Sequence, residues 1–222
     1  MIAFSKKTLT GIFSRKTDPL SMPVGSAGYV VVDTELTGLD LKRDSIISIG
    51  GVKMKGGRID LGSVFYRMIN PASEMDHRGI VVHGITPSDV AEKPASGDVL
   101  SEFAEFCGDD IIVGHFISLD MDFINKEMKS GHGRELKNRT VDTCRLYEWI
   151  RYGEGSFSSH YTVNADDLNL FAIAREYGIP VSGAHNALSD AFITAQLFQR
   201  FLSIFPGLGV STLKGLLKIG RP

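Results

Sequence analysis

The residues Tyr29-Val30-Val31-Val32, followed by Asp33-Thr34-Glu35, decide which fold this sequence predicts. The first four are aromatic or β-branched and stand between a glycine and an acid, which is typical of a buried central strand. Two further strands are expected at 46–54 and 58–69, because Gly56-Gly57 between them favours a two-residue hairpin turn. Three strands with such tight connections predict an antiparallel meander at the start of the sheet.

Beyond Pro71 the chain first carries loop signals, and then short apolar runs alternate with segments of helical spacing. The Gly- and Ser-rich residues 153–164 predict a loop. This order of elements predicts an α/β fold in which helices flank a mixed five-stranded sheet. Strands are expected at 111–113 and 140–143, and helices at 98–107, 119–129, 144–151, 166–177 and 187–201.

The length of 222 residues suits one such domain with short appendages. We expect a basic N-terminal extension over 1–28, hinged at Gly25-Ser26-Ala27-Gly28, a folded domain over 29–202 and a basic, apolar tail over 203–222. The uncharged runs near the termini are shorter than the roughly 20 apolar residues that span a bilayer, so no membrane span is expected. Two isolated cysteines, Cys107 and Cys144, indicate reduced thiols and a cytoplasmic protein.

The formal net charge of −2 at first counts against a nucleic-acid partner. The charge is unevenly spread, however, because the segments 1–28, 126–151 and 203–222 are basic and the rest of the chain carries the excess of acid. Acids that bind divalent cations repel phosphate less than their formal charge suggests. The basic segments are therefore candidates for contacting a nucleic-acid strand.

Several acids stand at the ends of predicted buried strands, where they can share a cation. Asp33 and Glu35 are two positions apart on a strand, so both side chains point to one face. Asp120 or Asp122 follows the strand at 111–113, although an acid at this point can also be favoured simply by the start of a helix.

A further acid, Asp190, lies in the first turns of the last helix among small and apolar neighbours, where a charge is costly without a partner such as a metal. His185 is five residues earlier, in the preceding loop, from which it can overhang the same site. Carboxylates suit hard divalent cations, which take oxygen ligands. Two such ions can activate water and stabilise the leaving oxygen of a phosphodiester, and a neighbouring His is the natural base.

Three segments carry a resemblance to a known family: Val32-Asp33-Thr34-Glu35-Leu36-Thr37-Gly38, Gly114-His115 with Leu119-Asp120, and His185-Asn186-Ala187-Leu188-Ser189-Asp190-Ala191. They resemble, in order, the three exonuclease motifs of the DEDDh 3′–5′ exonucleases, in particular the proofreading epsilon subunits of bacterial DNA polymerase III. The resemblance covers about residues 29–202, and Val82-His83-Gly84-Ile85-Thr86 matches a further family element near the active site. It implies a ribonuclease-H-like fold, which agrees with the predicted order of elements.

The resemblance also implies roles for individual residues. Asp33, Glu35 and Asp190 would hold two divalent cations, Mg²⁺ or Mn²⁺, with Asp120 completing the set and His185 acting as the general base. The second motif departs from the family pattern, because the family often has Asn after the His where this chain has a phenylalanine. The implied substrate-binding residues are Leu36, Thr37, Gly38, Leu39, His83 and Phe116.

The implied function is that of a metal-dependent 3′–5′ exonuclease that releases nucleoside 5′-monophosphates from single-stranded DNA ends in proofreading or repair. Nothing in the motifs reads the 2′-hydroxyl, so an exoribonuclease acting on short RNA or RNA 3′ ends is the alternative. A non-catalytic nucleic-acid-binding module would require the loss of an acid or of the base, and all five positions are filled. A polymerase or other protein could bind the tail, whose leucines could equally pack on the chain's own body.

Overall fold

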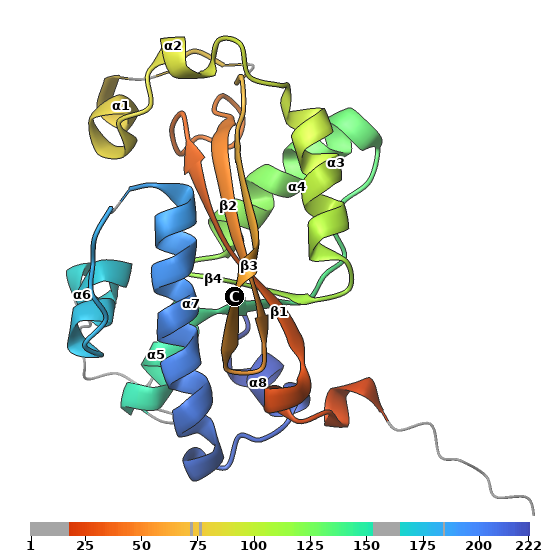
Figure 1. Cartoon of the computed structure of the whole chain (residues 1–222), viewed down its shortest axis with the longest axis vertical. Helices are drawn as coiled ribbons and strands as arrows, with labels where there is room; N and C mark the ends of the chain where they lie inside the picture. Colours follow the sequence, from red (N-terminus) through yellow and green to blue (C-terminus); the bar gives the residue numbers. More distant parts are fainter. Residues whose placement is uncertain (1–17, 72, 76, 153–164, 184) are drawn as a thin grey trace, which may run out of the picture.

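In this computed structural model, which describes residues 18–222 apart from 72, 76, 153–164 and 184, five strands form one sheet in the order β3-β2-β1-β4-β5 (Figure 1). The first three strands form the expected antiparallel meander, and the fourth and fifth run parallel to the first. The mixed five-stranded sheet predicted from the sequence is thus confirmed. The strands are β1 (Gly28–Leu36), β2 (Ile46–Lys55), β3 (Arg58–Met68), β4 (Ile111–Gly114) and β5 (Thr140–Asp142).

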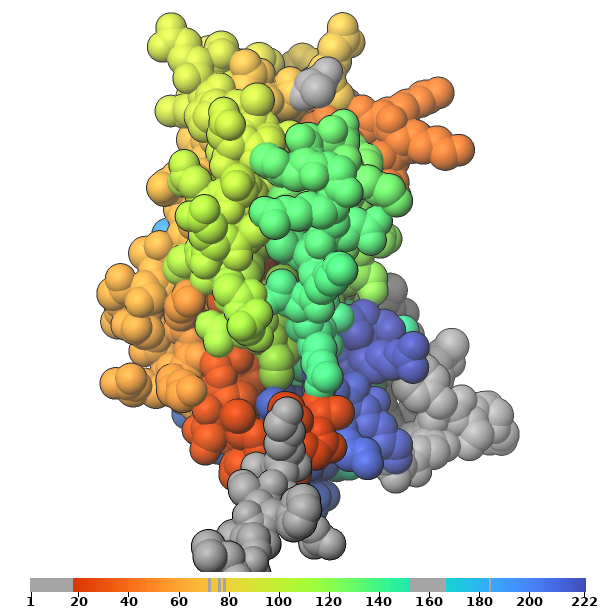
Figure 2. Space-filling model, turned by 90° about the vertical axis from the view of Figure 1, so that its right-hand side faces the viewer, coloured from red at the N-terminus to blue at the C-terminus, as the bar shows by residue number. Residues whose placement is uncertain are grey.

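Helices cover both faces of the sheet (Figure 1). The longest, α7 (Ala187–Ile204), crosses one face together with α5 (Thr143–Tyr152) and α6 (Leu170–Glu176). The other face is covered by α3 (Ser96–Cys107) and α4 (Ser118–His132), which lie side by side in Figure 2. The sheet is therefore the middle layer of three, with its two faces in separate apolar cores.

The alternation of side chains along β1 sorts its residues between these two cores. Tyr29 and Val31 point into the core on the α7 face, whereas Val30 and Val32 point into the core under α3 and α4. The same alternation continues past the buried residues, so Asp33 and Glu35 face α7 and Thr34 faces α4. The apolar pattern that builds the sheet thereby decides on which face each polar residue emerges.

Several elements differ from the sequence prediction. β1 extends to Leu36, so Asp33 and Glu35 lie within the strand and are held by its pairing with β2. The segment expected to be loop contains two short helices, α1 (His77–His83) and α2 (Pro87–Val90). The helix expected at 166–177 is broken, because Asn169 leaves helical geometry and caps α6 by accepting a hydrogen bond from the backbone of Phe171. The loop predicted at 153–164 lies outside the described residues.

The two ends of the described chain are joined to each other. Within the predicted hinge at 25–28, Ala27 is buried, whereas Gly25 and Ser26 are exposed. Directly before it, Val24 is buried, and its backbone N–H donates to the Ser211 carbonyl. The tail forms α8 (Leu213–Ile219), which buries Leu213 and Leu216. These two leucines of the tail therefore pack on the chain's own body, as one of the two expectations had it. No helix among the described residues is long and apolar enough to cross a membrane.

Candidate active site

Three carboxylates meet on the α7 face of the sheet, at the carboxyl end of β1. Asp33 and Glu35 come from β1 and Asp190 from the first turn of α7, and one oxygen atom of each lies within 4.8 Å of the others. The structure therefore brings together three of the four acids implied as metal ligands, from segments more than 150 residues apart.

The approach of α7 to the strands depends on Gly50 of β2. This glycine pairs with Asp33 across the β1–β2 ladder, and a Cβ atom there would collide with the Ala187 carbonyl and the Leu188 backbone nitrogen. Asn186 caps the helix directly above, because its side-chain oxygen accepts a hydrogen bond of 3.2 Å from the Ser189 backbone. The first turn of α7 is thus placed against bare backbone next to Asp33.

Asp190 has one oxygen in use and one without a partner. Its Oδ2 accepts a hydrogen bond of 3.0 Å from the backbone N–H of His185, whereas its buried Oδ1 has no hydrogen-bond partner among the described residues. A buried carboxylate oxygen without a partner is costly, and a cation is the partner that would offset that cost. The donor set, which consists of carboxylate oxygens alone, is the set that hard divalent cations bind.

Asp120 approaches from the other side of the sheet, on α4. It is buried, and its Oδ1 accepts a hydrogen bond of 2.6 Å from the Thr34 hydroxyl, which faces α4 for the reason given above. Its charge acts on Asp33 and Glu35, although its oxygens lie outside the group of three. Asp122, the alternative from the sequence, is exposed, so burial and proximity single out Asp120.

Burial and mutual repulsion make these acids hard to ionise. Desolvation, together with the charges of the other acids, raises the pKa of Asp33 well above its ordinary value and that of Glu35 to about 7. Burial raises the pKa of Asp120 to about 7 and that of Asp190 to about 6, with the Thr34 hydroxyl and the His185 backbone opposing the shift. Four ionised carboxylates here require positive charge nearby, and this requirement fits divalent cations.

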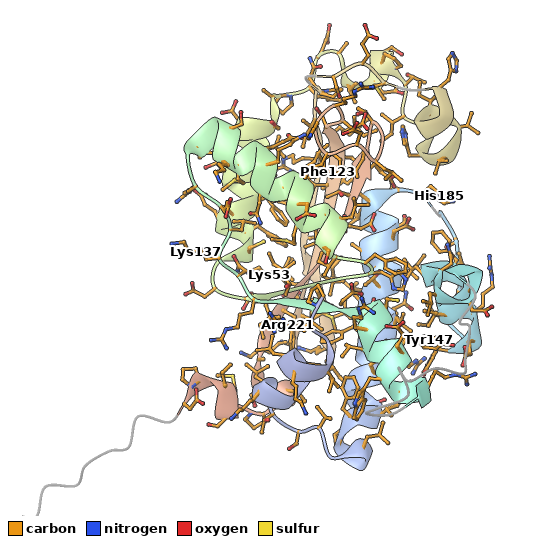
Figure 3. All side chains as sticks on the ribbon, turned by 180° about the vertical axis from the view of Figure 1, so that it is seen from behind. Lys53, Phe123, Lys137, Tyr147, His185 and Arg221 are labelled. Atoms are coloured by element: carbon orange, nitrogen blue, oxygen red, sulfur yellow. The ribbon has the colours of Figure 1, made fainter. Side chains whose placement is uncertain are left out.

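His185 lies in the loop before α7, as predicted, and its side chain is exposed (Figure 3). Its backbone has the left-handed φ of 65°, which is uncommon for a residue with a Cβ. The hydrogen bond from its N–H to Asp190 holds this conformation, and its ring packs edge-on to Phe171 at 5.3 Å between centroids. The base candidate and a metal-ligand candidate are therefore directly connected.

His83, at the end of α1, has a buried donor of its own. Its Nδ1 accepts a hydrogen bond of 3.0 Å from the Ile85 backbone, so the proton of the neutral ring is on Nε2. Burial and the nearby His185 lower the pKa of His83, which favours that neutral form. The Nε2 atom has no partner in the described part of the chain.

Four of the implied substrate contacts lie at the end of β1 and in the turn that follows it. Thr37 is 1% exposed, and its hydroxyl donates to the Asp44 carboxylate and accepts from the Ser45 backbone. Gly38 lies against the same carboxylate, which leaves no room for a Cβ atom. Leu36 packs against the core under α3 and α4, whereas Leu39 is 75% exposed. Of these four implied substrate contacts, only Leu39 offers a free side chain, and Thr37 could contribute its backbone.

A second histidine and acid lie near the same edge of the sheet. His115 follows β4, and Asp142 ends β5. The two ring nitrogens of His115 lie 2.9 Å from the Thr143 hydroxyl and 2.7 Å from the Leu168 carbonyl, and burial lowers its pKa to about 4. Asp142 accepts hydrogen bonds from the Phe116 and Cys144 backbones. Sequence reasoning missed Asp142 and Thr34, although an acid that ends a strand is the signal that singled out Asp120.

The basic residues of the segment 126–151 are spread over the structure: the Lys126 ammonium donates to the Asp44 carbonyl, in the turn after β1, whereas others pair within the segment or lie at a distance. Lys129 pairs with Glu135, and Arg145 with Glu148. Lys137 precedes β5, at the edge of the sheet opposite to the acid cluster, and Figure 3 shows it near Lys53 and far from His185. A strand bound at the acid cluster would therefore lie at the other edge of the sheet from Lys137.

Comparison with known proteins adds independent findings. The family model described as Exonuclease (RNase_T) matches residues 30–198. The chain is 33% identical over 174 residues to the DNA polymerase III subunit epsilon of Aquifex aeolicus, which covers 78% of this chain and 80% of that one. It is 31% identical over 195 residues to the PolC-type DNA polymerase III of Thermotoga maritima, of which it spans 13% while 88% of this chain is covered.

Two solved structures show that the fold is shared. Exonuclease I of E. coli in complex with a dT13 oligonucleotide superposes with a TM-score of 0.70 at 15% identity, covering 83% of this chain and 43% of that one. A 3′-exonuclease in a structure of 3′-end-specific recognition of the histone mRNA stem-loop superposes with a TM-score of 0.64 at 17% identity. The shared region covers 82% of this chain and 66% of that one.

Proposed function

Because this chain belongs to the exonuclease family and is a 3′–5′ exonuclease of the epsilon type, we propose that it cleaves single-stranded DNA ends with two divalent cations, Mg²⁺ or Mn²⁺, and His185 as general base. The observation that carries the proposal is the buried Oδ1 of Asp190, which has no partner among the described residues and lies beside two further carboxylates. The proposed ligands are Asp33, Glu35, Asp120 and Asp190. When bound, divalent cations would lower the pKa of water and stabilise charge on the leaving oxygen.

The chain's own residues would position the reaction and move its proton. Water attacks the phosphorus of the last phosphodiester, the bond from phosphorus to the O3′ of the preceding nucleotide breaks, and a nucleoside 5′-monophosphate leaves. The imidazole of His185 takes the proton of the attacking water. Asp190 holds the His185 backbone and Phe171 supports its ring, so the base is oriented by the same acid that faces the cations.

The remaining contacts would hold the terminal nucleotide. The Nε2–H of His83, a buried donor in need of an acceptor, is suited to a phosphate or sugar oxygen. Leu39 is suited to packing on a base, and the backbones of Thr37 and Gly38 to close approach. Leu36 would support this turn from below, through its packing on the core.

The nature of the nucleic acid can be decided directly. The DNA polymerase III relatives and the dT13 complex of exonuclease I support DNA. The similarity to the 3′-exonuclease that recognises histone mRNA supports the second candidate, an exoribonuclease. Side-by-side digestion of matched DNA and RNA oligonucleotides should show faster loss of DNA ends, and faster loss of the RNA would replace the DNA proposal.

A polymerase partner and a cytoplasmic location complete the proposal. The names of the relatives support the partner, and the two buried free thiols, Cys107 and Cys144, support the location. Deleting the tail would expose the packing surface of Leu216, which is fully buried, so a point substitution is the better test. Leu208→Glu, at an exposed position of the tail, should weaken co-purification with the polymerase, and full retention would contradict docking through this residue.

The metal site is tested by paired substitutions. Asp33→Ala and Asp120→Ala should each abolish the Mg²⁺- or Mn²⁺-dependent digestion of a 5′-labelled oligonucleotide. Asp122→Ala is the matched control, because this exposed acid lies two residues from Asp120 on the same helix. Undiminished digestion by Asp33→Ala would remove the proposed site, and a loss in Asp122→Ala would show that the assignment to Asp120 is wrong.

A further inference from the structure

Phe116 has an unfavourable backbone conformation for its residue type. Its φ is 54°, in the left-handed region, and His185 is the only other non-glycine residue with a positive φ in the described part of the chain. A bulky residue rarely adopts this conformation, whereas Asn, which the family often has at this position, does so more readily. Strain of this kind persists where the surrounding structure imposes it, and it is concentrated at functional sites.

The contacts around Phe116 hold the strained turn in place. Its backbone N–H donates a hydrogen bond of 3.1 Å to Asp142, and its carbonyl accepts one of 3.1 Å from the Leu119 backbone. Its ring lies 4.7 Å from that of His115 at an interplanar angle of 70°. His115 itself is anchored through both ring nitrogens, so the ring of Phe116 rests on a rigid support.

The ring of Phe116 contributes little to the core. The residue is 49% exposed, and its ring meets that of His115 in a T-shaped contact. Leu119, next in the same turn, is 39% exposed. The turn follows the carboxyl end of β4 and leads directly into the first turn of α4, where Asp120 lies. A half-exposed aromatic ring is thus held four residues before the buried Asp120.

We propose that Phe116 is a stacking platform for an unpaired base next to the bond that is cut, an inference that rests on the proposed function. Every base has a π face, so such a platform binds without reading sequence. It selects for unpaired ends, since a base within a duplex would first have to leave its stack. In this arrangement Phe116 contributes to substrate affinity, and the acids and His185 carry the chemistry.

The test compares three variants on two substrates. Phe116→Leu keeps an apolar side chain without the π face, Phe116→Trp keeps the π face, and Phe116→Asn also relieves the backbone strain. The first substrate is a 5′-labelled DNA oligonucleotide, and the second carries abasic sugars in place of its last two nucleotides. Leu61→Asn serves as the control, because Leu61 is 70% exposed on β3 and is no part of the site.

Phe116→Leu should raise the KM for the normal strand by about 5- to 150-fold, the range that corresponds to loss of one base-stacking contact. Its kcat should stay within about threefold, Phe116→Trp should restore the KM, and on the abasic strand Phe116→Leu should equal wild type. Phe116→Asn should raise the KM equally without lowering the melting temperature. An unchanged KM in Phe116→Leu, or equal losses on both strands, would overturn the platform.

A binding measurement separates this proposal from the proposed function. Fluorescence anisotropy with the same labelled strands, in the inactive Asp33→Asn background, reports affinity without cleavage. If wild type does not digest DNA, the proposed cleavage of DNA ends fails, while the loss of affinity in Phe116→Leu still decides the platform. If wild type digests DNA and Phe116→Leu binds both strands as tightly as the background does, only the platform fails.

Discussion

Two pairs of histidine and aspartate lie at the same edge of the sheet and are built in opposite ways. His115 and Asp142 lie at the ends of β4 and β5, and His185 and Asp190 lie at the start of α7. In the first pair both ring nitrogens have close partners and the carboxylate accepts two backbone hydrogen bonds. In the second pair the imidazole is exposed, and one buried carboxylate oxygen has no partner among the described residues.

The difference shows that residue type alone does not distinguish a structural His–Asp pair from a reactive one. What distinguishes them is whether their polar atoms already have hydrogen-bond partners. His115 is held neutral by burial, with a pKa of about 4, and has no nitrogen left for a substrate. Asp142 is held by backbone N–H groups that remain in place in any step of a reaction. In contrast, Asp190 keeps a buried oxygen that has no hydrogen-bond partner among the described residues, and the imidazole of His185 is exposed. Both lie in a site that needs positive charge. We therefore expect substitutions in the first pair to change stability and substitutions in the second to change catalysis.

The largest contrast is expected between Asp190→Asn and Asp142→Asn. Asp190→Asn removes a proposed metal ligand, and since a metal supplies several kcal/mol of transition-state stabilisation, kcat should fall by about 10³-fold or more. Asp142→Asn keeps an oxygen that can accept from the Phe116 and Cys144 backbones, so its kcat should stay within about threefold. Steady-state digestion at saturating Mg²⁺ measures both, and similar losses in the two variants would contradict the contrast.

The two histidines should separate next. His185→Ala should lower kcat by about 10²- to 10⁴-fold with an unchanged melting temperature, since the ring is exposed. His115→Ala removes the hydrogen-bond partner of the Leu168 carbonyl, at a cost of about 1–3 kcal/mol, whereas the Thr143 hydroxyl can still donate to the Gly114 carbonyl. In a chain of this size each kcal/mol lowers the melting temperature by roughly 2–4 °C. Turnover together with thermal melts decides, and unchanged turnover in His185→Ala would point to another base.

Without metal, the stability of the protein should depend on pH in two ways, one due to the buried acids of the site and the other due to His115. Glu35, Asp120 and Asp190 have folded pKa values of about 6 to 7, above those of the unfolded chain, so their contribution is present at low pH and is lost as pH rises through this range. The folded pKa of His115 is lowered to about 4, so its contribution is present above pH 6.5 or so and is lost as pH falls.

Thermal melts in EDTA between pH 4.5 and 9 would resolve both effects. Asp33→Asn should melt a few degrees above wild type at pH 8, because it removes one repelling charge, and saturating Mg²⁺ should reduce the difference. His115→Gln should reduce only the loss of stability that occurs as the pH falls. If Asp33→Asn melted below wild type at pH 8 without metal, the acids would not be mutually destabilising.

Much of the fold follows from local pattern. The apolar run at Tyr29–Val32 and the hairpin glycines Gly56-Gly57 predict the meander, because a buried strand and a tight turn are each encoded by neighbouring residues. The pairing of Asp33 with Glu35 on one face follows from strand geometry in the same way. Short helices such as α1 and α2 are harder to predict, since seven or four residues hold too little periodicity.

The rest of the site depends on distant neighbours. Apart from the resemblance of Leu119-Asp120 to a family motif, local pattern does not distinguish Asp120 from Asp122, whereas the Thr34 hydroxyl, 86 residues away, marks the buried acid. Gly50 looks like a weak point in a strand until α7 is seen against it. The left-handed φ of Phe116 is likewise invisible in a sequence where Asn would be the easier residue. These features arise from contacts between elements and cannot be read from periodicity.

The smallest contrast concerns the two threonines that support these pairs. Thr34 donates to Asp120 at 2.6 Å on the reactive side, and the Thr143 hydroxyl lies 2.9 Å from His115 on the structural side. Thr→Val removes each hydroxyl at nearly constant volume. Thr34→Val should lower metal affinity or turnover by about 10-fold, the lower end of the range for partners of metal ligands, because Asp120 loses the bond that orients it.

Thr143→Val should leave kcat within about threefold and lower the melting temperature by roughly 2–4 °C, the equivalent of one hydrogen bond of about 1 kcal/mol. Titration of activity with Mg²⁺ and a melt of each variant measure both effects. If Thr34→Val changed only the melting temperature, the Thr34 hydroxyl would be structural too, and Asp120 would need no help from β1 to face the cations.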